Sequence, residues 1–246
     1  MDIALAVIGG TGVYRLAALE DVEARHVDTP YGAPSGPLRI GRLGEQRIAF
    51  LARHGEGHAL PPHRVNYRAN LHALKQIGAT RVLALNTVGG ITDAYGPRVL
   101  ACPDQLIDYT WGRESTFWDG EGEAVHVDFG HPYSPMFRHK VLAAARVTGA
   151  RVVDGGCYGA TQGPRLETNA EIARMRRDGC DLVGMTGMPE AGLARELGLQ
   201  YACLGIVANW AAGCGDEAEI TMAEVLANVE TASTGIPPLL RSILAG

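Results

Sequence analysis

Short apolar runs alternate with amphipathic segments along most of this sequence, and that alternation constrains its fold more than any other feature. Seven runs are typical of buried strands: Ile3–Ile8, Arg47–Leu51, Arg81–Leu85, Val99–Ile107, Val152–Tyr158, Leu182–Met185 and Tyr201–Ala208. Five segments have a helical pattern: Asn66–Ile77, Pro135–Val147, Asn169–Arg177, Pro189–Leu197 and Thr221–Thr231. A glycine and two prolines at 235–238 precede a short C-terminal helix. The alternation predicts an α/β protein whose parallel or mixed sheet is covered by helices.

The length and charge of the chain bound its organisation and its partners. Its 246 residues, 46% of them hydrophobic, can bury one sizeable core, so we expect residues 1–246 to form a single domain. The 22 basic and 27 acidic residues leave a net charge of −5, which argues against nucleic acid or an anionic membrane as a partner. A bound anion would have to be held by positive groups placed locally.

Cysteine usage and targeting signals favour the cytoplasm. The five cysteines are scattered and include no C-x-x-C pair, which predicts reduced thiols rather than a disulfide framework or a zinc site. The N-terminus carries Asp2 and no basic region of a signal peptide. The longest apolar stretch, Tyr201–Ala212, is too short to span a bilayer. We therefore expect a soluble cytoplasmic protein.

The first predicted strand runs directly into Gly9-Gly10-Thr11-Gly12. Glycines at a strand end expose backbone N–H groups, and a threonine hydroxyl adds a donor, so an anion can bind there. Arg15 stands where the third glycine of a dinucleotide fingerprint would fall, which argues against an NAD-dependent Rossmann enzyme, and no Gly-Lys-Ser/Thr of a Walker loop follows. The junction alone fits an anion site or an ordinary structural turn.

Further polar groups follow other predicted strands. Arg53-His54-Gly55 comes after Arg47–Leu51, a glycine-bearing turn with Thr87 comes after Arg81–Leu85, and Thr186 comes after Leu182–Gly184. In open α/β sheets ligands bind outside the carboxyl ends of strands, so these groups and Thr11 would share one edge. Together they are typical of a phosphate pocket. Taken singly, Arg53 could instead form a surface ion pair, and His54 could be an ordinary polar residue.

A second group of polar residues lies in the later half of the chain. Thr168 and Glu171 have the spacing of a helix capping box, which leaves the preceding acid, Glu167, without a structural explanation. Asn209 ends the predicted strand Tyr201–Ala208, where it could also be a simple turn residue.

Five motifs in this order resemble the trimeric purine nucleoside phosphorylase family, and most of all its branch of 5′-methylthioadenosine and methylthioinosine phosphorylases. The motifs are Ile8-Gly9-Gly10-Thr11-Gly12, Leu51-Ala52-Arg53-His54-Gly55, Val65-Asn66-Tyr67-Arg68-Ala69-Asn70, Gly163-Pro164-Arg165-Leu166-Glu167-Thr168 and Met185-Thr186-Gly187-Met188-Pro189-Glu190. The resemblance runs from about Ile8 to the final helix. It implies a single-domain, three-layer α/β/α fold with a central mixed sheet.

The resemblance also implies a reaction and a set of residues. The reaction is reversible phosphorolysis, in which inorganic phosphate attacks C1′ of a purine nucleoside, with no metal or cofactor. The implied phosphate ligands are Thr11, Arg53, His54, Thr87, the Val88 backbone and Thr186. The implied substrate contacts are Met185 and Leu166 near the sugar and base, and Glu167 and Asn209 at the base. His126 matches a histidine lent to a neighbouring subunit, so a homotrimer, or a dimer of trimers, is expected.

Two positions bear on which nucleoside is used. The Asn209 amide can donate to O6 and N7 of a 6-oxopurine, and Glu167 can accept from N1–H, a proton that adenine lacks. Methylthioadenosine phosphorylases of the family carry Asp where Asn209 and Ala211 stand. Met222 falls where ordinary purine nucleoside phosphorylases have a histidine for the 5′-hydroxyl, unless it is a core methionine.

An oxopurine site with an apolar 5′ end points to S-methyl-5′-thioinosine, cleaved to hypoxanthine and 5-methylthioribose 1-phosphate. Three alternatives remain open on the same fold: an inosine or guanosine phosphorylase, a 5′-methylthioadenosine phosphorylase, and a purine-binding protein without activity.

Overall fold

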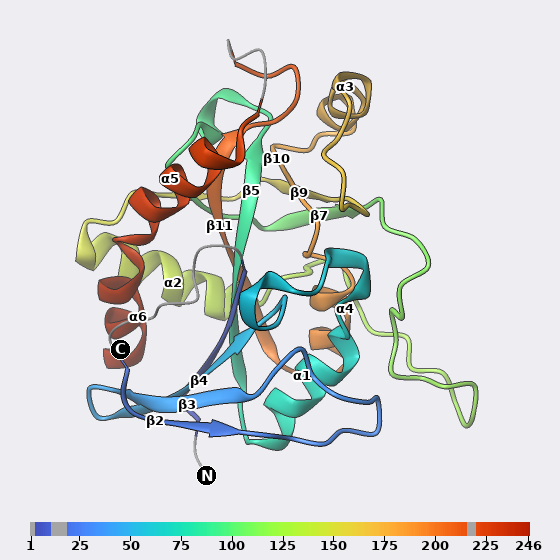
Figure 1. Ribbon diagram of the computed structural model, residues 1–246, viewed down its shortest axis with the longest axis vertical. Helices are drawn as coiled ribbons and strands as arrows, with labels where there is room; N and C mark the ends of the chain where they lie inside the picture. The colour runs from blue at the N-terminus through green and yellow to red at the C-terminus, as the bar shows by residue number, and fades with distance from the viewer. Residues whose placement is uncertain (1–2, 11–18, 216–219) are drawn as a thin grey trace.

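A central β-sheet covered by helices on both faces forms the body of the protein (Figure 1). The computed structural model describes residues 3–10, 19–215 and 220–246. Within these ranges the strands are β1 (Leu5–Gly9), β2 (Glu20–Arg25), β3 (Leu38–Leu43), β4 (Gln46–Ala52), β5 (Arg81–Gly90), β6 (Leu100–Cys102), β7 (Gln105–Asp108), β8 (Val152–Asp154), β9 (Cys157–Ala160), β10 (Leu182–Gly184) and β11 (Gln200–Trp210). The α-helices are α1 (Tyr67–Gln76), α2 (Pro135–Thr148), α3 (Asn169–Arg177), α4 (Glu190–Glu196), α5 (Met222–Ser233) and α6 (Ile236–Ala245). None of the helices described is long and apolar enough to cross a membrane.

The sheet is mixed, as predicted. Its main path runs β2-β3-β4-β1-β5-β10-β9-β7, while β11 joins β5 to β6 and β6 pairs with β8. The central strands β4, β1, β5 and β11 are parallel to their neighbours in this group, and the β2-β3-β4 edge is antiparallel.

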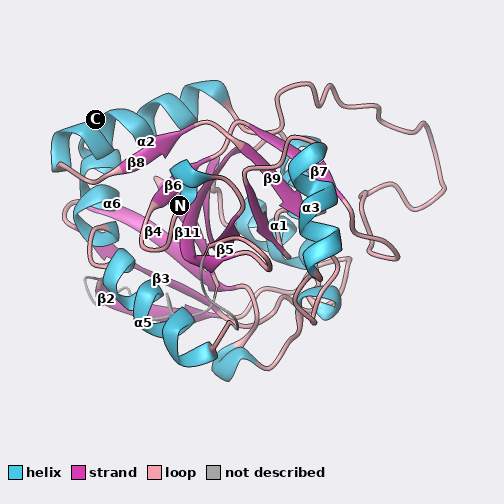
Figure 2. Cartoon of the chain, turned by 90° about the horizontal axis from the view of Figure 1, so that it is seen from above, coloured by secondary structure: helices cyan, strands magenta, loops and turns pink. Residues whose placement is uncertain are grey.

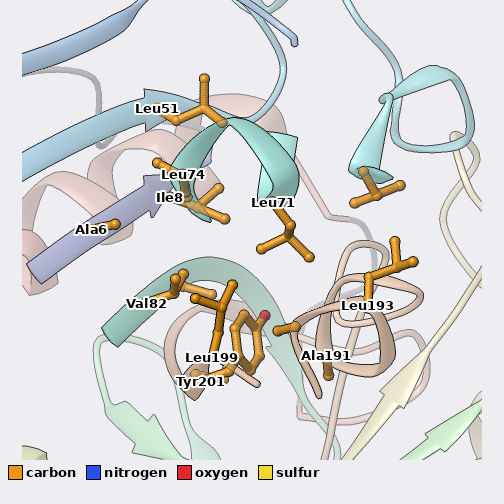
Figure 3. Packing of buried hydrophobic residues seen from close by; sticks show 14 of the residues in the cluster. Ala6, Ile8, Leu51, Leu71, Leu74, Val82, Ala191, Leu193, Leu199 and Tyr201 are labelled. Atoms are coloured by element: carbon orange, nitrogen blue, oxygen red, sulfur yellow. The ribbon is translucent and has the colours of Figure 1, made fainter. Parts of the chain in front are cut away.

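Alternation along β1 assigns the helices to two layers. Ala6 and Ile8 point into a core shared with α1 and α4, whereas Leu5 and Val7 point into a core shared with α2, α5 and α6. All four side chains are fully buried, because successive side chains of a strand face opposite sides of the sheet. Figure 3 shows the first core, where side chains of the sheet meet those of the two helices: Ile8, Leu51, Val82, Leu71, Leu74, Ala191 and Leu193. The expected three-layer α/β/α arrangement is confirmed.

Two predicted strands are each divided in the structure. Val99–Ile107 is interrupted at Pro103, which has no N–H to donate, so β6 and β7 pair with different partners. Val152–Tyr158 is interrupted at Gly155 and Gly156, whose φ values of 94° and 98° are incompatible with an extended strand. The prediction also missed β2 and β3; the side chains of β2 are all exposed and give no apolar pattern, whereas β3 is partly buried.

The long strand β5 places the site (Figure 1). Along one edge, β1 pairs with β5 only as far as Ala84, and β10 takes over at Gly89. Residues 85–88 therefore lie at a gap between the two neighbouring strands, while β11 continues along the other edge. The prediction of a turn at Asn86–Gly90 is wrong, because pairing with β11 keeps the segment extended.

Candidate active site

A cavity of about 390 Å³ opens beside this gap in the sheet. Ten of the twelve residues expected to form the site line it: Arg53, His54, Thr87, Val88, Leu166, Glu167, Met185, Thr186, Asn209 and Met222. Thr11 lies outside the described residues, although the neighbouring Gly10 lines the cavity. Residues from distant parts of the chain thus meet in one space, as expected, although Thr87 lies within β5 rather than after it and Thr186 follows β10, which is antiparallel to β5.

Arg53 follows β4 and fills the gap along β5. Its Nη1 donates to the Leu85 carbonyl at 3.0 Å, so the guanidinium satisfies a backbone acceptor left between β1 and β10. Gly10 is packed against it: a Cβ at Gly10 would lie 3.2 Å from Nη1. The side chain is completely buried at the cavity wall, which rules out the alternative of a surface ion pair.

The partner of Arg53 is Glu190, a residue to which sequence reasoning gave no role. Nε and Nη2 of Arg53 donate to its two carboxylate oxygens at 2.7 and 2.8 Å, and the Tyr201 hydroxyl donates to one of them at 2.9 Å. Burial opposes the arginine charge, but the attraction and hydrogen bonds of Glu190 outweigh burial and raise the pKa of Arg53. Among the described residues that line the cavity, Arg53 is the only arginine or lysine.

His54 is a neutral ring at neutral pH. Burial and the nearby Arg53 charge lower the pKa of His54 to about 4, although a backbone hydrogen bond to Leu60 opposes the shift. Its Nδ1 lies 2.8 Å from the Leu60 carbonyl, and because a carbonyl only accepts, Nδ1 carries the proton. Nε2 is then a hydrogen-bond acceptor. The ring of His58 stacks on His54 with centroids 4.2 Å apart, and both line the cavity.

Thr186 is fixed by a buried hydrogen bond across the gap. The Asn86 amide of β5 donates to the Thr186 hydroxyl oxygen at 2.8 Å, which leaves the hydroxyl proton available for another acceptor. Thr87 and Val88 follow on β5 and line the same wall. The hydroxyls and backbone of these residues can surround an anion at the end of the cavity near Arg53.

Glu167 is positioned at the cavity wall by its own hydrogen bond. The capping box of α3 uses Thr168 and Glu171, as predicted, and leaves Glu167 outside it. Instead, the Thr161 hydroxyl donates to Glu167 Oε1 at 2.5 Å. One carboxylate oxygen is therefore oriented by the protein, while the side chain lines the cavity.

Asn209 follows an irregularity in β11. Val207 pairs with Val88, but the next paired residue is Asn209, opposite Gly89, so Ala208 forms a bulge. A bulge changes which way the following side chains point. The absence of a side chain at Gly89 leaves room, since a Cβ there would lie 3.4 Å from Asn209 Nδ2. Nδ2 donates to the Trp210 carbonyl at 2.6 Å, and one N–H remains for a ligand.

Met222 is the first residue of α5 and lines the cavity with two apolar neighbours, Ile220 and Val225. Thr221 caps the helix by accepting from the Glu224 N–H at 3.3 Å, which fixes the start of α5 beside the cavity. The Met222 side chain is 61% exposed, so the alternative of a core methionine is wrong.

His126 does not line the cavity of its own chain. It lies exposed in the segment 109–134, which contains neither helix nor strand. Figures 1 and 2 show this segment projecting from the body of the protein between β7 and α2. Its predicted role in a neighbouring subunit is not tested by a single chain. No group of three or more potential metal ligands occurs in the described parts of the chain.

Comparisons with known proteins agree with this geometry. The model of the Phosphorylase superfamily matches residues 4–245. A "Probable S-methyl-5′-thioinosine phosphorylase" of Xanthomonas campestris pv. campestris is 77% identical over 100% of this chain and 98% of its own. A "6-oxopurine nucleoside phosphorylase" of Pyrococcus furiosus is 43% identical over 96% of this chain and 90% of its own.

Among solved structures, a methylthioadenosine phosphorylase from an Antarctic soil metagenomic library superimposes with a TM-score of 0.93 at 33% identity. That match covers 99% of this chain and 86% of the other. With the same fold and relatives matched over nearly its whole length, the chain belongs to the Phosphorylase superfamily.

Proposed function

We propose that this protein is an S-methyl-5′-thioinosine phosphorylase, which forms hypoxanthine and 5-methylthioribose 1-phosphate. The observation that carries the proposal is one cavity lined by three chemically different sets of side chains. Its anion end has Arg53 and Thr186, its base end has Glu167 and Asn209, and Met222 stands at an apolar wall. The name of the Xanthomonas relative supports the same substrate.

At the anion end, the neutral ring of His54, with its proton on Nδ1, favours hydrogen phosphate as the bound species. The neutral ring can accept a hydrogen bond at Nε2 from the single O–H of hydrogen phosphate, while Thr186 donates to another oxygen. The Arg53 N–H groups not directed at Glu190 and Leu85 are further donors. Fixed donors of this kind hold the nucleophile without reorganisation during the reaction.

At the base end, Asn209 stabilises the departing purine and Glu167 orients it. A phosphate oxygen supplies the electron pair that forms the new bond to C1′, and the pair of the C1′–N9 bond leaves with hypoxanthine. The proton of hydrogen phosphate ends on the base, so charge and atoms balance. The remaining N–H of the Asn209 amide, given to O6 or N7, stabilises the base as negative charge develops on it, while the Glu167 carboxylate orients the base by accepting from N1–H.

We also propose that the enzyme works as a homotrimer, or as a dimer of trimers, in the cytoplasm and without a metal or cofactor. The exposed segment 109–134 supports a subunit contact, because Trp111 and Val125 in it are 71% and 70% exposed. His126 of that segment would then complete a neighbour's site. Light scattering of wild type and His126→Ala, with activity measured on the same samples, tests the assembly and the shared residue separately.

A phosphorylase of inosine or guanosine is the second candidate, supported by the name of the Pyrococcus relative. A 5′-methylthioadenosine phosphorylase and a purine-binding protein without activity are the remaining alternatives. A substrate panel at saturating phosphate separates them. We expect the highest kcat/KM with methylthioinosine, and a higher value with inosine, guanosine or methylthioadenosine would overturn the substrate assignment.

A further inference from the structure

Arg113 uses all five of its N–H groups within the protein, although it comes from the loop segment 109–134. Nε donates to the side-chain oxygen of Gln162 at 3.2 Å. Nη1 donates to the carbonyls of Met185 and Met188 at 2.8 and 2.6 Å. Nη2 donates to the carbonyls of Thr161 and Gln162 at 3.2 and 2.8 Å. A guanidinium has five N–H donors, and each of them has an acceptor here.

The acceptors belong to two loops that both carry residues lining the candidate site. Thr161 and Gln162 follow β9 and lead to Glu167 at the base end, and Thr161 itself donates to Glu167. Met185 and Met188 follow β10 and flank Thr186 at the anion end. Nη1 serves the loop after β10, and Nη2 and Nε serve the loop after β9, so a rigid planar group sets the spacing between them.

The charge of Arg113 is balanced by dipoles rather than by an acid. None of the ion pairs found in the described ranges involves Arg113. Its guanidinium carbon lies 5.6 Å from the ring centroid of Tyr67, and the carbonyl oxygens surround its edge. Binding this set of carbonyl oxygens requires several N–H donors at fixed positions in one plane. Lysine cannot supply them, because all of its donors are on a single nitrogen.

We propose that Arg113 is a positioning residue. It holds the loop after β9, residues 161–168, and the loop after β10, residues 185–189, at the separation needed for phosphorolysis. The consequence for catalysis rests on the proposed function, whereas the clamp itself does not. Displacing reacting groups by about 1 Å can reduce a rate 10²-fold, so loosening this clamp affects turnover even though Arg113 is not placed among the substrate contacts.

Arg113→Lys tests the clamp, with Arg138→Lys as the matched control. Arg138 also donates to two backbone carbonyls, those of Pro103 and Cys102 at 2.9 and 2.8 Å, and it pairs with Asp154 at 2.6 Å, but none of these acceptors belongs to the two loops of the site. We expect Arg113→Lys to lower kcat by between about tenfold and 10²-fold, with KM for phosphate and for nucleoside raised less than threefold each. Arg138→Lys should leave all three values within about twofold of wild type, even if its thermal midpoint falls similarly.

Two further measurements separate positioning from a general loss of stability. Hydrogen–deuterium exchange should rise in residues 161–168 and 185–189 of Arg113→Lys and not in the control. Millimolar guanidinium should restore part of the kcat/KM of Arg113→Ala and none of that of Arg138→Ala. Unchanged exchange in both loops, or equal kinetic effects of the two lysine variants, would overturn the inference. A wild-type enzyme that turns over without phosphate would instead overturn the proposed function, while the exchange data would still decide the clamp.

Discussion

Arg53 and Glu190 form a bidentate ion pair at the anion end of the cavity, with nitrogen–oxygen distances of 2.7 and 2.8 Å and side chains at most 1% exposed. The positive charge that faces the anion site is therefore matched by a negative charge before any anion binds. Because the pair is buried, its balance affects both the stability of the fold and the affinity for phosphate.

Glu190→Gln should destabilise the phosphate-free protein and strengthen phosphate binding. The amide removes the negative charge and leaves Arg53 buried without its counter-ion, which costs about 3 kcal/mol. A bound phosphate restores neutrality, so saturating phosphate should raise the thermal midpoint of the variant more than that of wild type. In Arg53→Ala, phosphate should raise the thermal midpoint less than it does in wild type, and the KM for phosphate should be higher. Equal shifts in wild type and Glu190→Gln would contradict this account of the pair.

The stability of the protein should fall in acid because of His54. Its pKa is about 4 in the folded state against a usual value of 6.5, so the unfolded chain binds more protons between these pH values. Stability is therefore lost as pH falls from 6.5 to 4, by about 3 kcal/mol at roughly 1.4 kcal/mol per pKa unit. Urea unfolding at a series of pH values measures the loss. His54→Gln should flatten the profile over this range, and an unchanged slope would assign the titration to another group.

Asn209→Asp should shift the preference of the enzyme toward the 6-amino purine. A carboxylate accepts from N6 of adenine and repels O6 of hypoxanthine, which reverses the donor pattern of the amide. We expect the ratio of kcat/KM for methylthioinosine to that for methylthioadenosine to fall on the order of 10²-fold. If a folded variant keeps the wild-type ratio, base selection lies elsewhere, with Glu167 the next residue to change.

Met222→His should improve inosine as a substrate and impair methylthioinosine. The imidazole offers a donor to the 5′-hydroxyl and removes apolar contact with a methylthio group, each worth about 1–3 kcal/mol. The ratio of kcat/KM for the two nucleosides should change at least tenfold. Leu226→His is the control, because Leu226 is exposed on the same helix but does not line the cavity. Similar ratios for both variants would remove Met222 from the 5′ site.

The alternation of apolar and amphipathic segments in the sequence predicted the layers of the fold. It did not predict the contacts that depend on strand pairing. Asn86–Gly90 has the glycines and polar residues of a turn, and pairing of β5 with β11 holds it in a strand instead. Local propensity is a weak signal where a neighbouring strand supplies hydrogen bonds along the whole edge. The gap between β1 and β10 lies on the other edge of β5, where β1 pairs only as far as Ala84 and β10 begins at Gly89.

The polar residues Arg53, Thr87 and Thr186 could be predicted as one site, although of these three only Arg53 follows a strand parallel to its neighbour: Thr87 lies within β5, and Thr186 follows β10, which is antiparallel to β5. Their supporting partners could not. Glu190 is 137 positions from Arg53 in the sequence. Arg113 donates to backbone carbonyls, which every type of residue has, so the sequence does not indicate these contacts. Glu190 had a weak signal as an acid in the first turn of a helix, which reads equally well as dipole compensation.

Phosphorus NMR of a reaction between methylthioinosine and inorganic phosphate tests the central claim most directly, with hypoxanthine measured in the same sample. We predict no base release without phosphate, and in its presence one phosphate converted to a sugar phosphate for each hypoxanthine formed. Base release without phosphate, or without a sugar phosphate signal, would contradict phosphorolysis. Absence of release with methylthioinosine under conditions where inosine is cleaved would contradict the substrate that we propose.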